Sequence, residues 1–315
     1  MSKRKKLIII AAAALLAVVV GVCLFFGIRY YRESNVTFTI KDTLPDGNGK
    51  EATIILLGGQ SNASGASLDE YLAKNVSPEK YAEYKEGYDN VYINFLSGPK
   101  MSQEFVPCSI LQGEGESAFG PELGLADKLH EMYPDKTFFI IKCAWGGTNL
   151  YSQWLSPTSK GMTGSLYKQF VTFVNTNVDY LISKNYEVKI EGMCWMQGES
   201  DAFTVEHSKK YAEHLSNLIG DIRNEFSQYA GEDGIAFVDA YIADTPGAWP
   251  YYEAVNRGKA EVAGRSPMNV VIDTIAAGLE CTEEPEGAPD LAHYDSMSEI
   301  LLGHLFAEAL SEFLS

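Results

Sequence analysis

The 315-residue chain is poor in basic residues, cysteine and histidine, and each scarcity argues against a class of function. Its 25 Lys and Arg residues stand against 42 Asp and Glu residues, a formal net charge of −17. Such a chain repels nucleic acids and other anionic polymers, so we expect no nucleic-acid partner. The five cysteines and five histidines include no Cys-x-x-Cys pair and no Cys/His spacing typical of zinc, so the sequence predicts no metal site.

The basic residues that are present gather at the N-terminus. Six of the 25 precede position 33, where none of the 42 acidic residues occurs, so the remainder has a formal charge of about −23. Neutral or weakly charged substrates suit such a field better than anionic ones. In this remainder Cys143 and Cys194 end apolar runs, which is typical of buried thiols rather than of a disulfide.

The first residues have the pattern of a membrane anchor. A basic segment, residues 1–6, precedes the uncharged apolar run Leu7–Ile28. As a helix this run would be about 33 Å long, enough to cross the hydrocarbon core of a bilayer. Because more basic residues precede the run than follow it, we expect residues 1–6 in the cytoplasm, a transmembrane signal-anchor over 7–28, and the remainder outside the cell.

Two other interpretations of this run stay open. The Val-Val-Gly sequence at 19–21 would be tolerated as a signal-peptide cleavage site, which would release a secreted protein, although the apolar stretch continues to Phe26 without an Ala-x-Ala end. A lipid-anchored Cys23 is disfavoured because Val22 stands where a small residue is expected. The favoured location is therefore the cell membrane, with residues 29–50 as a juxtamembrane segment and first strand.

Downstream of the anchor, strand-like and helix-like segments alternate. A first strand is expected at Val36–Ile40, with a turn at 45–49. Further strands are expected at 54–57, 91–95, 137–143, 189–195, 234–239 and 269–274. Helices are expected at 121–133, 166–184, 205–226, 252–263 and 296–313.

Alternation of strands and helices predicts a mostly parallel sheet covered by helices on both faces. No linker or repeat divides the chain, so we expect one α/β/α domain over residues 51–315. Residues 96–118 contain Ser97-Gly98-Pro99 and Gly113-Glu114-Gly115-Glu116 and are expected to form a long loop beside the substrate cleft.

A strand that ends at a serine points to the function. The apolar run Ile54–Leu57 leads into Gly59-Gln60-Ser61-Asn62, which places the Ser61 hydroxyl at the carboxyl end of a strand. Open α/β sheets bind their ligands at this end. A serine hydroxyl needs a histidine to take its proton, and the histidine needs a carboxylate to orient it.

The histidines identify the partner of this serine by elimination. His130, His207, His214 and His304 all lie in segments with helical spacing, where a structural role is expected. His293 lies in a loop, three residues after Asp290. We therefore expect Ser61, His293 and Asp290 to form a catalytic triad.

Two more predicted strands end in groups that can stabilise an oxyanion, which requires aimed N–H donors. Gly146 and Gly147 follow the strand at 137–143, and Gln197 follows the strand at 189–195. We expect the Gln197 amide to face the edge where Ser61 lies. The glycines by themselves would be more typical of a plain turn with positive φ than of a ligand site.

Other polar and aromatic residues near these strand ends are candidates for supporting a loop or the substrate. Glu199 and Asp201 are interpreted as orienting the loop or capping a helix, with direct catalysis as the less favoured alternative. Gln60 and Asn62 flank the serine, and Trp154 is one of several aromatics in loop-like segments, where sugar rings commonly stack. The others are Tyr151, Trp249, Tyr251 and Tyr252.

Four motifs in this order resemble the conserved blocks of the SGNH hydrolases. They are most similar to the carbohydrate acetylesterase branch, which includes sialate O-acetylesterases and acetylxylan esterases. The resemblance covers nearly everything after about residue 50. The motifs are Gly59–Asn62, Ala144–Thr148, Trp195–Asp201 and Asp290–His293.

The resemblance implies a three-layer SGNH or flavodoxin-like fold and an ester hydrolase that removes acetyl groups from a carbohydrate without a metal or organic cofactor. It implies Ser61 as nucleophile, His293 as general base and acid, and Asp290 as the residue that orients His293. It also implies an oxyanion hole in which the Ser61 N–H takes part.

The other oxyanion donors implied by the resemblance are the N–H of Gly146 or Gly147 and the side chain of Gln197. The wider superfamily has an asparagine in a Gly-x-Asn-Asp block at the last position, and glutamine replaces it in the acetylesterase branch. Which glycine faces the oxyanion stays open, although the Gly-x-Thr pattern favours Gly146.

The substrate also stays open between acetylated xylan, another glycan and acetylated sialic acid, with the charge of the chain favouring neutral sugars. One alternative is an esterase for lipid, thioester or peptidoglycan O-acetyl groups. Another is a surface glycan-binding module with a decayed site. The presence of Ser61, Gln197, Asp290 and His293 together argues against decay.

Overall fold

A computed structural model describes residues 37–245 and 247–314 of the chain. The basic segment 1–6, the predicted anchor 7–28 and residues 29–36 lie outside the described residues. Within the described ranges, no helix combines the length and the apolar character needed to span a bilayer.

An eight-stranded, mostly parallel sheet forms the centre of the described structure. Its edge strands β4 and β5 pair antiparallel with β3, and two short strands, β2 (Ser67–Leu68) and β6 (Ala118–Phe119), form a separate antiparallel ribbon. The strands of the main sheet lie in the order β10 (Asn269–Ile272), β9 (Ala236–Ala240), β8 (Glu187–Met196), β1 (Glu51–Gly59), β7 (Phe138–Ala144), β3 (Tyr88–Ser97) and β4 (Lys100–Met101), with β5 (Val106–Cys108) beside β3.

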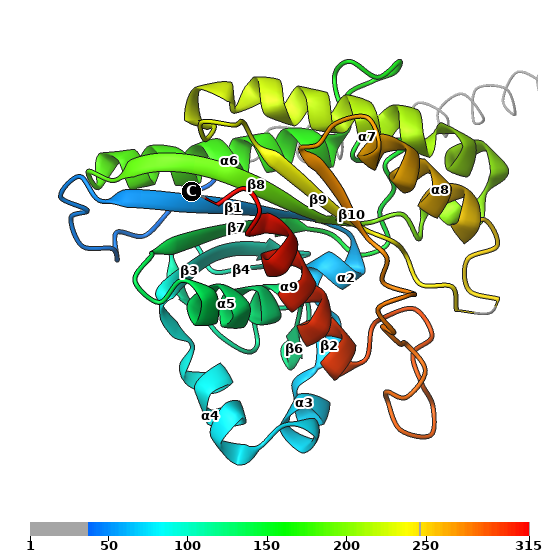
Figure 1. The fold of residues 1–315 in the computed structure, drawn as a ribbon, viewed down its shortest axis with the longest axis horizontal. Coiled ribbons are helices and arrows are strands. Elements are labelled where there is room, and N and C mark those ends of the chain that lie inside the picture. The colour runs from blue at the N-terminus through cyan, green and yellow to red at the C-terminus, as the bar shows by residue number, and fades with distance from the viewer. Residues whose placement is uncertain (1–36, 246, 315) are drawn as a thin grey trace, which may run out of the picture. The chain divides into compact units, whose positions relative to one another are not determined.

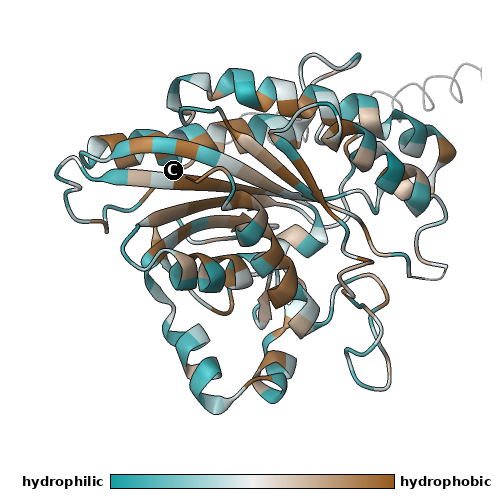
Figure 2. Cartoon of the chain, viewed as in Figure 1, coloured by the Kyte–Doolittle hydropathy of each residue, from teal (hydrophilic) through white to brown (hydrophobic). Residues whose placement is uncertain are grey.

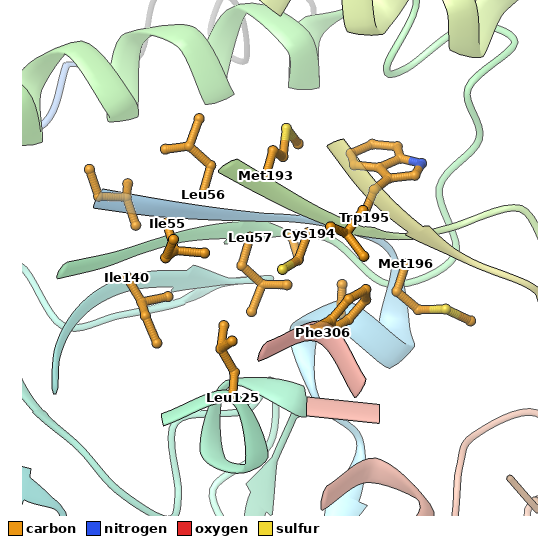
Figure 3. Packing of buried hydrophobic residues seen from close by; sticks show 14 of the residues in the cluster. Ile55, Leu56, Leu57, Leu125, Ile140, Met193, Cys194, Trp195, Met196 and Phe306 are labelled. Atoms are coloured by element: carbon orange, nitrogen blue, oxygen red, sulfur yellow. The ribbon is translucent and has the colours of Figure 1, made fainter. Parts of the chain in front are cut away.

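The sequence of β1 explains its central position. Every residue of β1 after Glu51 is buried, because parallel strands β7 and β8 flank it and helices cover both faces. A strand buried on both faces is a continuous apolar run rather than an alternating one. Figure 3 shows Leu56 directed to one side of the sheet, while Leu57 is directed to the other, toward Leu125 and Phe306.

Helices cover both faces of the sheet, as Figure 1 shows. On one face lie α6 (Ser165–Ser183), α7 (Val205–Glu225) and α8 (Tyr252–Ala263). On the other face α5 (Pro121–Met132) packs against α9 (Ser296–Leu310). Figure 2 shows that the strands between these layers are mostly hydrophobic, so the core lies on both sides of the sheet.

The expected strands from 54 to 274 and all five expected helices are confirmed, with ends shifted by a few residues. The expected loop at 96–118 is largely irregular but contains β4 and β5. Three α-helices of the described residues were not predicted from the sequence: the one-turn α2 (Ser61–Ser64), α3 (Asp69–Asn75) and α4 (Pro78–Glu86). Figure 2 shows α4 as almost entirely hydrophilic, so it has little of the apolar periodicity that reveals a helix.

The predicted strand at Val36–Ile40 is wrong for residues 37–40, which are irregular, while Val36 lies outside the described residues. The Phe38 ring packs edge-on against Phe173 of α6, with ring centroids 4.9 Å apart. Next to it, Lys41 N–H donates to the Gln103 carbonyl at 2.8 Å. This segment therefore packs on a helix and a loop instead of pairing with a sheet edge.

The order of the parallel strands differs from that of flavodoxin. Counted along the chain, the first strand (β1) lies between the third (β7) and the fourth (β8), whereas in flavodoxin the second strand is next to the first. The flavodoxin-like part of the predicted fold is therefore wrong in strand order. After β7 the chain passes β1 and forms β8 on its other side, so the direction in which strands are added to the sheet reverses at β1. Open sheets bind ligands at the carboxyl ends of the strands where this reversal occurs, which here is the carboxyl end of β1.

The four described cysteines, Cys108, Cys143, Cys194 and Cys281, are buried free thiols. The expectation of buried thiols at Cys143 and Cys194 is confirmed. Burial also raises the pKa of Cys194 well above its ordinary value, so this thiol is unreactive.

A buried aspartate connects the elements on the α5–α9 face. Asp127 of α5 accepts hydrogen bonds from Lys80 Nζ at 2.6 Å, Tyr88 Oη at 2.8 Å and Tyr84 Oη at 3.1 Å, and its Oδ2 lies 2.8 Å from His304 Nε2. Burial by itself would raise the pKa of Asp127, but the hydrogen bonds and the Lys80 charge outweigh it and hold the pKa well below its usual range.

We predict that Asp127→Asn lowers the free energy of unfolding by roughly 2–3 kcal/mol at pH 7, because it removes a charge that several buried donors share. Folding lowers the pKa of this carboxyl, so its contribution is present above the unfolded pKa of about 3.9 and is lost as the pH falls below it. Urea unfolding should show a deficit that shrinks below about pH 4. An equal deficit in the exposed Asp135→Asn control would contradict the prediction.

Candidate active site

Three parallel strands end at the same level and bring the predicted site residues together. Gly59 at the end of β1 pairs with Ala144 at the end of β7 and with Met196 at the end of β8. A Cβ on Gly59 would lie 2.0 Å from the Met196 carbonyl oxygen, and its φ is +141°, so only glycine fits between these strand ends. Ser61 is two residues after Gly59, so it lies at the edge of the sheet where β1, β7 and β8 all end.

Ser61 is the first residue of a one-turn helix, α2 (Ser61–Ser64), at the end of the sheet in Figure 1. The first N–H groups of a helix have no intrahelical acceptor, so the Ser61 N–H is available to a ligand. Ser61 opens into a pocket of about 600 Å³, whose walls come from several segments. Its lining residues are Gln60, Ser61, Ala66, Leu68, Glu114, Gly115, Ala118, Gly146, Gly147, Ser200, Phe203, Trp249, Asp290 and His293.

Asp290 and His293 form a hydrogen-bonded pair in the wall of the same pocket. His293 Nδ1 lies 2.6 Å from Asp290 Oδ2, and the other carboxylate oxygen accepts from the Ala292 N–H at 3.0 Å. Burial would raise the pKa of Asp290, but the bonds from His293 and Ala292 lower it below its ordinary value. The bond to a carboxylate places a proton on Nδ1, which leaves Nε2 of the neutral ring as a proton acceptor.

The Ser61 hydroxyl and His293 share the pocket without a direct hydrogen bond among the contacts of the described residues. Catalytic hydrogen bonds in ligand-free enzymes are often long and tighten when substrate binds. The structure therefore brings the three predicted triad residues to one pocket, with the Asp290–His293 pair already formed.

Asn62 connects the serine helix to the histidine loop. Its Oδ1 accepts from the Tyr294 N–H at 3.1 Å, and its Nδ2 donates to the Ala292 carbonyl at 3.4 Å. These two backbone groups lie immediately after and before His293. Asn62 is buried, so its amide holds the backbone on both sides of His293 in a fixed position relative to Ser61.

Glu199 in turn holds Asn62. Its Oε1 accepts from Asn62 Nδ2 at 2.9 Å, across 137 positions of sequence, and Glu199 is buried. Burial raises the pKa of Glu199, and the hydrogen bond from Asn62 opposes part of the rise. Glu199 does not line the pocket, so it acts on the site through Asn62.

The expectation that Gln197 aims its amide at the pocket is wrong in this structure. Gln197 is fully buried, and its Nε2 lies 2.7 Å from Asp201 Oδ2, 3.1 Å from the Thr148 carbonyl and 3.2 Å from Gln60 Oε1. The Tyr211 hydroxyl donates to its Oε1 at 3.1 Å. Three acceptors compete for the two hydrogens of the Gln197 amide, so neither hydrogen is left to donate to a ligand.

Asp201 supports the turn after β7. Its carboxylate accepts from the N–H groups of Leu150 at 2.8 Å and Tyr151 at 3.1 Å, in addition to Gln197. Burial raises the pKa of Asp201, and these hydrogen bonds oppose the rise. Asp201 therefore ties the segment after β8 to the segment after β7.

The two glycines of that turn are needed for different reasons. A Cβ on Gly146 would lie 2.8 Å from Glu114 Oε2, so a side chain there would displace the glutamate. Gly147 has open space around it but a φ of +67°, which favours glycine. Both line the pocket, and neither donates its N–H to another backbone group of the described turns and loops.

The aromatic residues near the site divide into core and pocket groups. Trp154, predicted as a support for substrate or loop, is 1% exposed, so it does not touch substrate; its indole N–H donates to Thr148 Oγ1 at 3.0 Å in the turn after β7. Trp249 does line the pocket. Phe203, which was not predicted, lies beside it with ring centroids 5.2 Å apart and is 54% exposed.

A buried ion pair lies beneath α2. Lys142 Nζ donates to Glu122 Oε2 at 2.6 Å, to the Ser64 carbonyl at 2.9 Å and to the Gln112 carbonyl at 3.2 Å, and both charged side chains are fully buried. The pair therefore anchors the end of the serine helix and the neighbouring loop. A single lysine inside the apolar run of β7 is the sequence signal that could have identified it.

Among the described residues there is no group of three or more His, Cys, Asp or Glu side chains arranged to hold a metal ion. The pocket brings together a serine hydroxyl, an imidazole that is hydrogen-bonded to a carboxylate, and backbone N–H groups of Gly146 and Gly147 with no backbone acceptor in the described turns and loops.

Comparisons with known proteins identify the family. The profile of the family described as "Carbohydrate esterase, sialic acid-specific acetylesterase" matches residues 51–312. A probable 9-O-acetyl-N-acetylneuraminic acid deacetylase of Escherichia coli (strain K12) is 24% identical over 190 residues, which are 54% of this chain and 56% of that protein. The match thus spans little more than half of that relative.

Solved structures show the same fold at low sequence identity. A protein from Arabidopsis thaliana aligns with a TM-score of 0.59 at 18% identity, covering 84% of this chain and all of the other. A carbohydrate acetylesterase from Xanthomonas citri aligns with a TM-score of 0.56 at 17% identity, covering 83% of this chain and 56% of the other.

The family profile, together with the fold, identifies the class of protein as that of the carbohydrate esterases. The chain belongs to the carbohydrate esterase family of sialic acid-specific acetylesterases. The predicted resemblance to carbohydrate acetylesterases is confirmed.

We predict that Asn62→Ala lowers kcat for ester hydrolysis by roughly 10- to 100-fold with little change in KM, because His293 loses its fixed position while the pocket stays open. Glu199→Gln keeps an oxygen that accepts from Asn62 and should retain most activity. Asn177→Ala, which removes a buried amide in α6, should lower stability but not kcat. A rise in KM alone for Asn62→Ala would contradict the positioning role.

Proposed function

We propose that this protein is a serine esterase that removes O-acetyl groups from a carbohydrate, with Ser61 as nucleophile, His293 as general base and acid, and Asp290 as the residue that orients His293. The observation that carries the proposal is the Asp290–His293 hydrogen bond of 2.6 Å in the same pocket as Ser61. The family of carbohydrate esterases supports the choice of ester and substrate class.

The reaction has two halves. Ser61 Oγ attacks the carbonyl carbon of the acetyl ester while His293 Nε2 takes the hydroxyl proton, and the tetrahedral intermediate collapses to an acetyl-enzyme as His293 returns that proton to the departing sugar oxygen. Water then attacks the acetyl-enzyme with the same proton transfers and releases acetate. Ionised Asp290 stabilises the imidazolium that forms in each half.

The oxyanion donors that the geometry leaves available are backbone N–H groups and one side chain. We propose the Ser61 N–H and a glycine N–H from the Gly146–Gly147 turn as two of the donors, since these residues line the pocket and donate to no other backbone group of the described turns and loops. The Gln60 Oε1 accepts from Gly198 N–H at 3.4 Å and Ser200 N–H at 3.2 Å. Because this oxygen is held on the interior side and Gln60 lines the pocket, its amide N–H replaces that of Gln197 as the side-chain donor in our proposal.

Aromatic rings favour a sugar over a lipid as the substrate. The exposed Phe203 and the partly buried Trp249 pack together in the wall of the pocket that contains Ser61, and the apolar faces of sugar rings stack on such surfaces. Acetylated xylan fragments and acetylated sialic acid both remain within this substrate class. The alternative substrates are lipid esters, thioesters and O-acetylated peptidoglycan. A preference for octanoyl over acetyl esters would favour a lipid substrate.

We predict that Ser61→Ala and His293→Ala each lower kcat for an acetylated sugar by several orders of magnitude, roughly 10⁴-fold or more, without unfolding the protein. Asp290→Asn should cost the same or less, because the oxyanion donors remain in place. Ser117→Ala, an exposed serine outside the pocket, is the control. Acetate release and circular dichroism are the measurements.

A fluorophosphonate probe provides the direct test of the nucleophile. It should label the wild-type protein at Ser61, fail to label Ser61→Ala, and label Ser117→Ala normally. Near-wild-type hydrolysis by His293→Ala, or labelling that persists in Ser61→Ala, would refute the triad. A decayed binding module would show no labelling in any variant.

We also propose that residues 7–28 anchor the protein in the cell membrane with the esterase domain outside. The distribution of basic residues around this run supports the proposal. Protease added to intact cells should digest the domain, and detergent should be needed to extract the protein. A mature protein that starts near Val22 in the medium would show instead that the segment is a cleaved signal peptide.

A further inference from the structure

The pocket wall around Ser61 is acidic. Besides His293, its titratable lining residues are Glu114 and Asp290, and no lysine or arginine of the described chain lines it. Asp290 is engaged by His293 and by its own loop. Glu114 is therefore the carboxylate in this pocket that the proposed mechanism does not use.

Glu114 is held in place next to the nucleophile. Its N–H donates to the Gly65 carbonyl at 2.8 Å, directly after α2, and its Oε2 accepts from Ser64 Oγ at 2.7 Å. The carboxylate lies against Gly146, where a Cβ would be 2.8 Å from Oε2. These contacts position the carboxylate between the serine helix and the turn after β7.

The other carboxylate oxygen, Oε1, has no hydrogen-bond donor among the described residues, and Glu114 takes part in no ion pair there. Two lysines that bond to neighbouring segments, Lys100 and Lys142, are engaged with other groups. Lys100 does not line the pocket, and its Nζ donates to the carbonyl oxygens of Leu111 and of Gly115, a residue of the pocket wall, while Lys142 is buried with Glu122. Glu114 thus has acceptor capacity left for a ligand in the pocket.

We propose that Glu114 is a substrate-binding residue that accepts a hydrogen bond from a hydroxyl of an uncharged acetylated sugar and disfavours sugars that carry a carboxylate. This inference rests on the proposed function. A carboxylate accepts only, and a sugar hydroxyl supplies the proton. A sugar carboxylate would bring a like charge into a pocket without a lysine or arginine to pair with it, which weakens binding.

The selectivity that we propose differs from the substrate, sialic acid, that the family description names. The Escherichia coli relative is named for an acidic sugar, N-acetylneuraminic acid. In the present chain the acidic pocket favours neutral sugars such as acetylated xylosides. The negative net charge of the chain also disfavours anionic sugars, but it acts at long range and is screened by salt. Glu114 acts at short range, inside the pocket.

The test uses Glu114→Gln, which keeps the size of the side chain and an oxygen that accepts from Ser64, and removes the charge. Glu116→Gln is the matched control, because Glu116 is an exposed glutamate on the same loop that does not line the pocket. Both variants lose one negative charge. Three kinds of substrate separate the effects: nitrophenyl acetate, an acetylated methyl xyloside, and 9-O-acetylated sialic acid compared with its C1 carboxamide.

We expect Glu114→Gln to raise KM for the acetylated xyloside roughly tenfold more than it raises KM for nitrophenyl acetate, because only the xyloside has hydroxyls to donate. In the wild type, kcat/KM for the acetylated sialic acid should be about tenfold below that for its carboxamide, which differs only in charge. In Glu114→Gln the kcat/KM values for the acid and for its carboxamide should differ by no more than about twofold. Glu116→Gln should leave every ratio at its wild-type value.

Two results would overturn the role of Glu114. An equal loss of activity on nitrophenyl acetate would show that Glu114 acts by supporting α2 through Ser64. An acid-to-carboxamide ratio that is the same in wild type and Glu114→Gln would show that its charge does not select substrates. Failure of the proposed function is distinguishable, because the wild-type protein would then release no acetate from any of the sugars.

Discussion

The parallel pairing of β1 with β7 on one side and β8 on the other is the constraint on which the candidate site depends. Gly59 pairs with both Ala144 and Met196, so three strands end at one level. Whatever follows these strands is brought to the same edge of the sheet. A slip of one residue in either pairing would move a strand end away from Ser61 and would turn the apolar residues of the slipped strand toward the wrong face.

The short helix that carries Ser61 cannot hold its own position, because a single turn gains too few hydrogen bonds to form alone. Buried polar contacts hold it instead: Asn62 joins it to Glu199 and to the His293 loop, and Lys142 holds its last carbonyl. Burying such groups is costly unless they are paired, and here they are hydrogen-bonded to one another. These hydrogen bonds form only when α2 and the His293 loop have their native positions, so the stability of the buried groups and the geometry of the pocket depend on each other.

Two predictions located a residue correctly along the chain and misjudged its direction. Gln197 does follow the end of β8, but its amide donates to Asp201, four residues later, and the side chain is buried rather than directed into the pocket. Trp154 does lie in an irregular segment, yet that segment folds over the sheet and packs the indole edge-on against Trp195, with centroids 5.1 Å apart. Both outcomes also depend on contacts between distant segments, because Gln197 donates to the Thr148 carbonyl and Trp154 packs against Trp195, and no local pattern contains such contacts.

The sequence by itself determined the features that depend on short range. Periodicity and composition identified the core strands and helices, and a spacing of three residues identified the Asp290–His293 pair, since both partners lie in one loop. Only the tertiary structure decided which strands are neighbours, that Asn62 lies against residues 230 positions away, and that Glu114 reaches the wall beside Gly146. Those contacts follow from strand order, which is set by packing over the whole sheet rather than by any single segment.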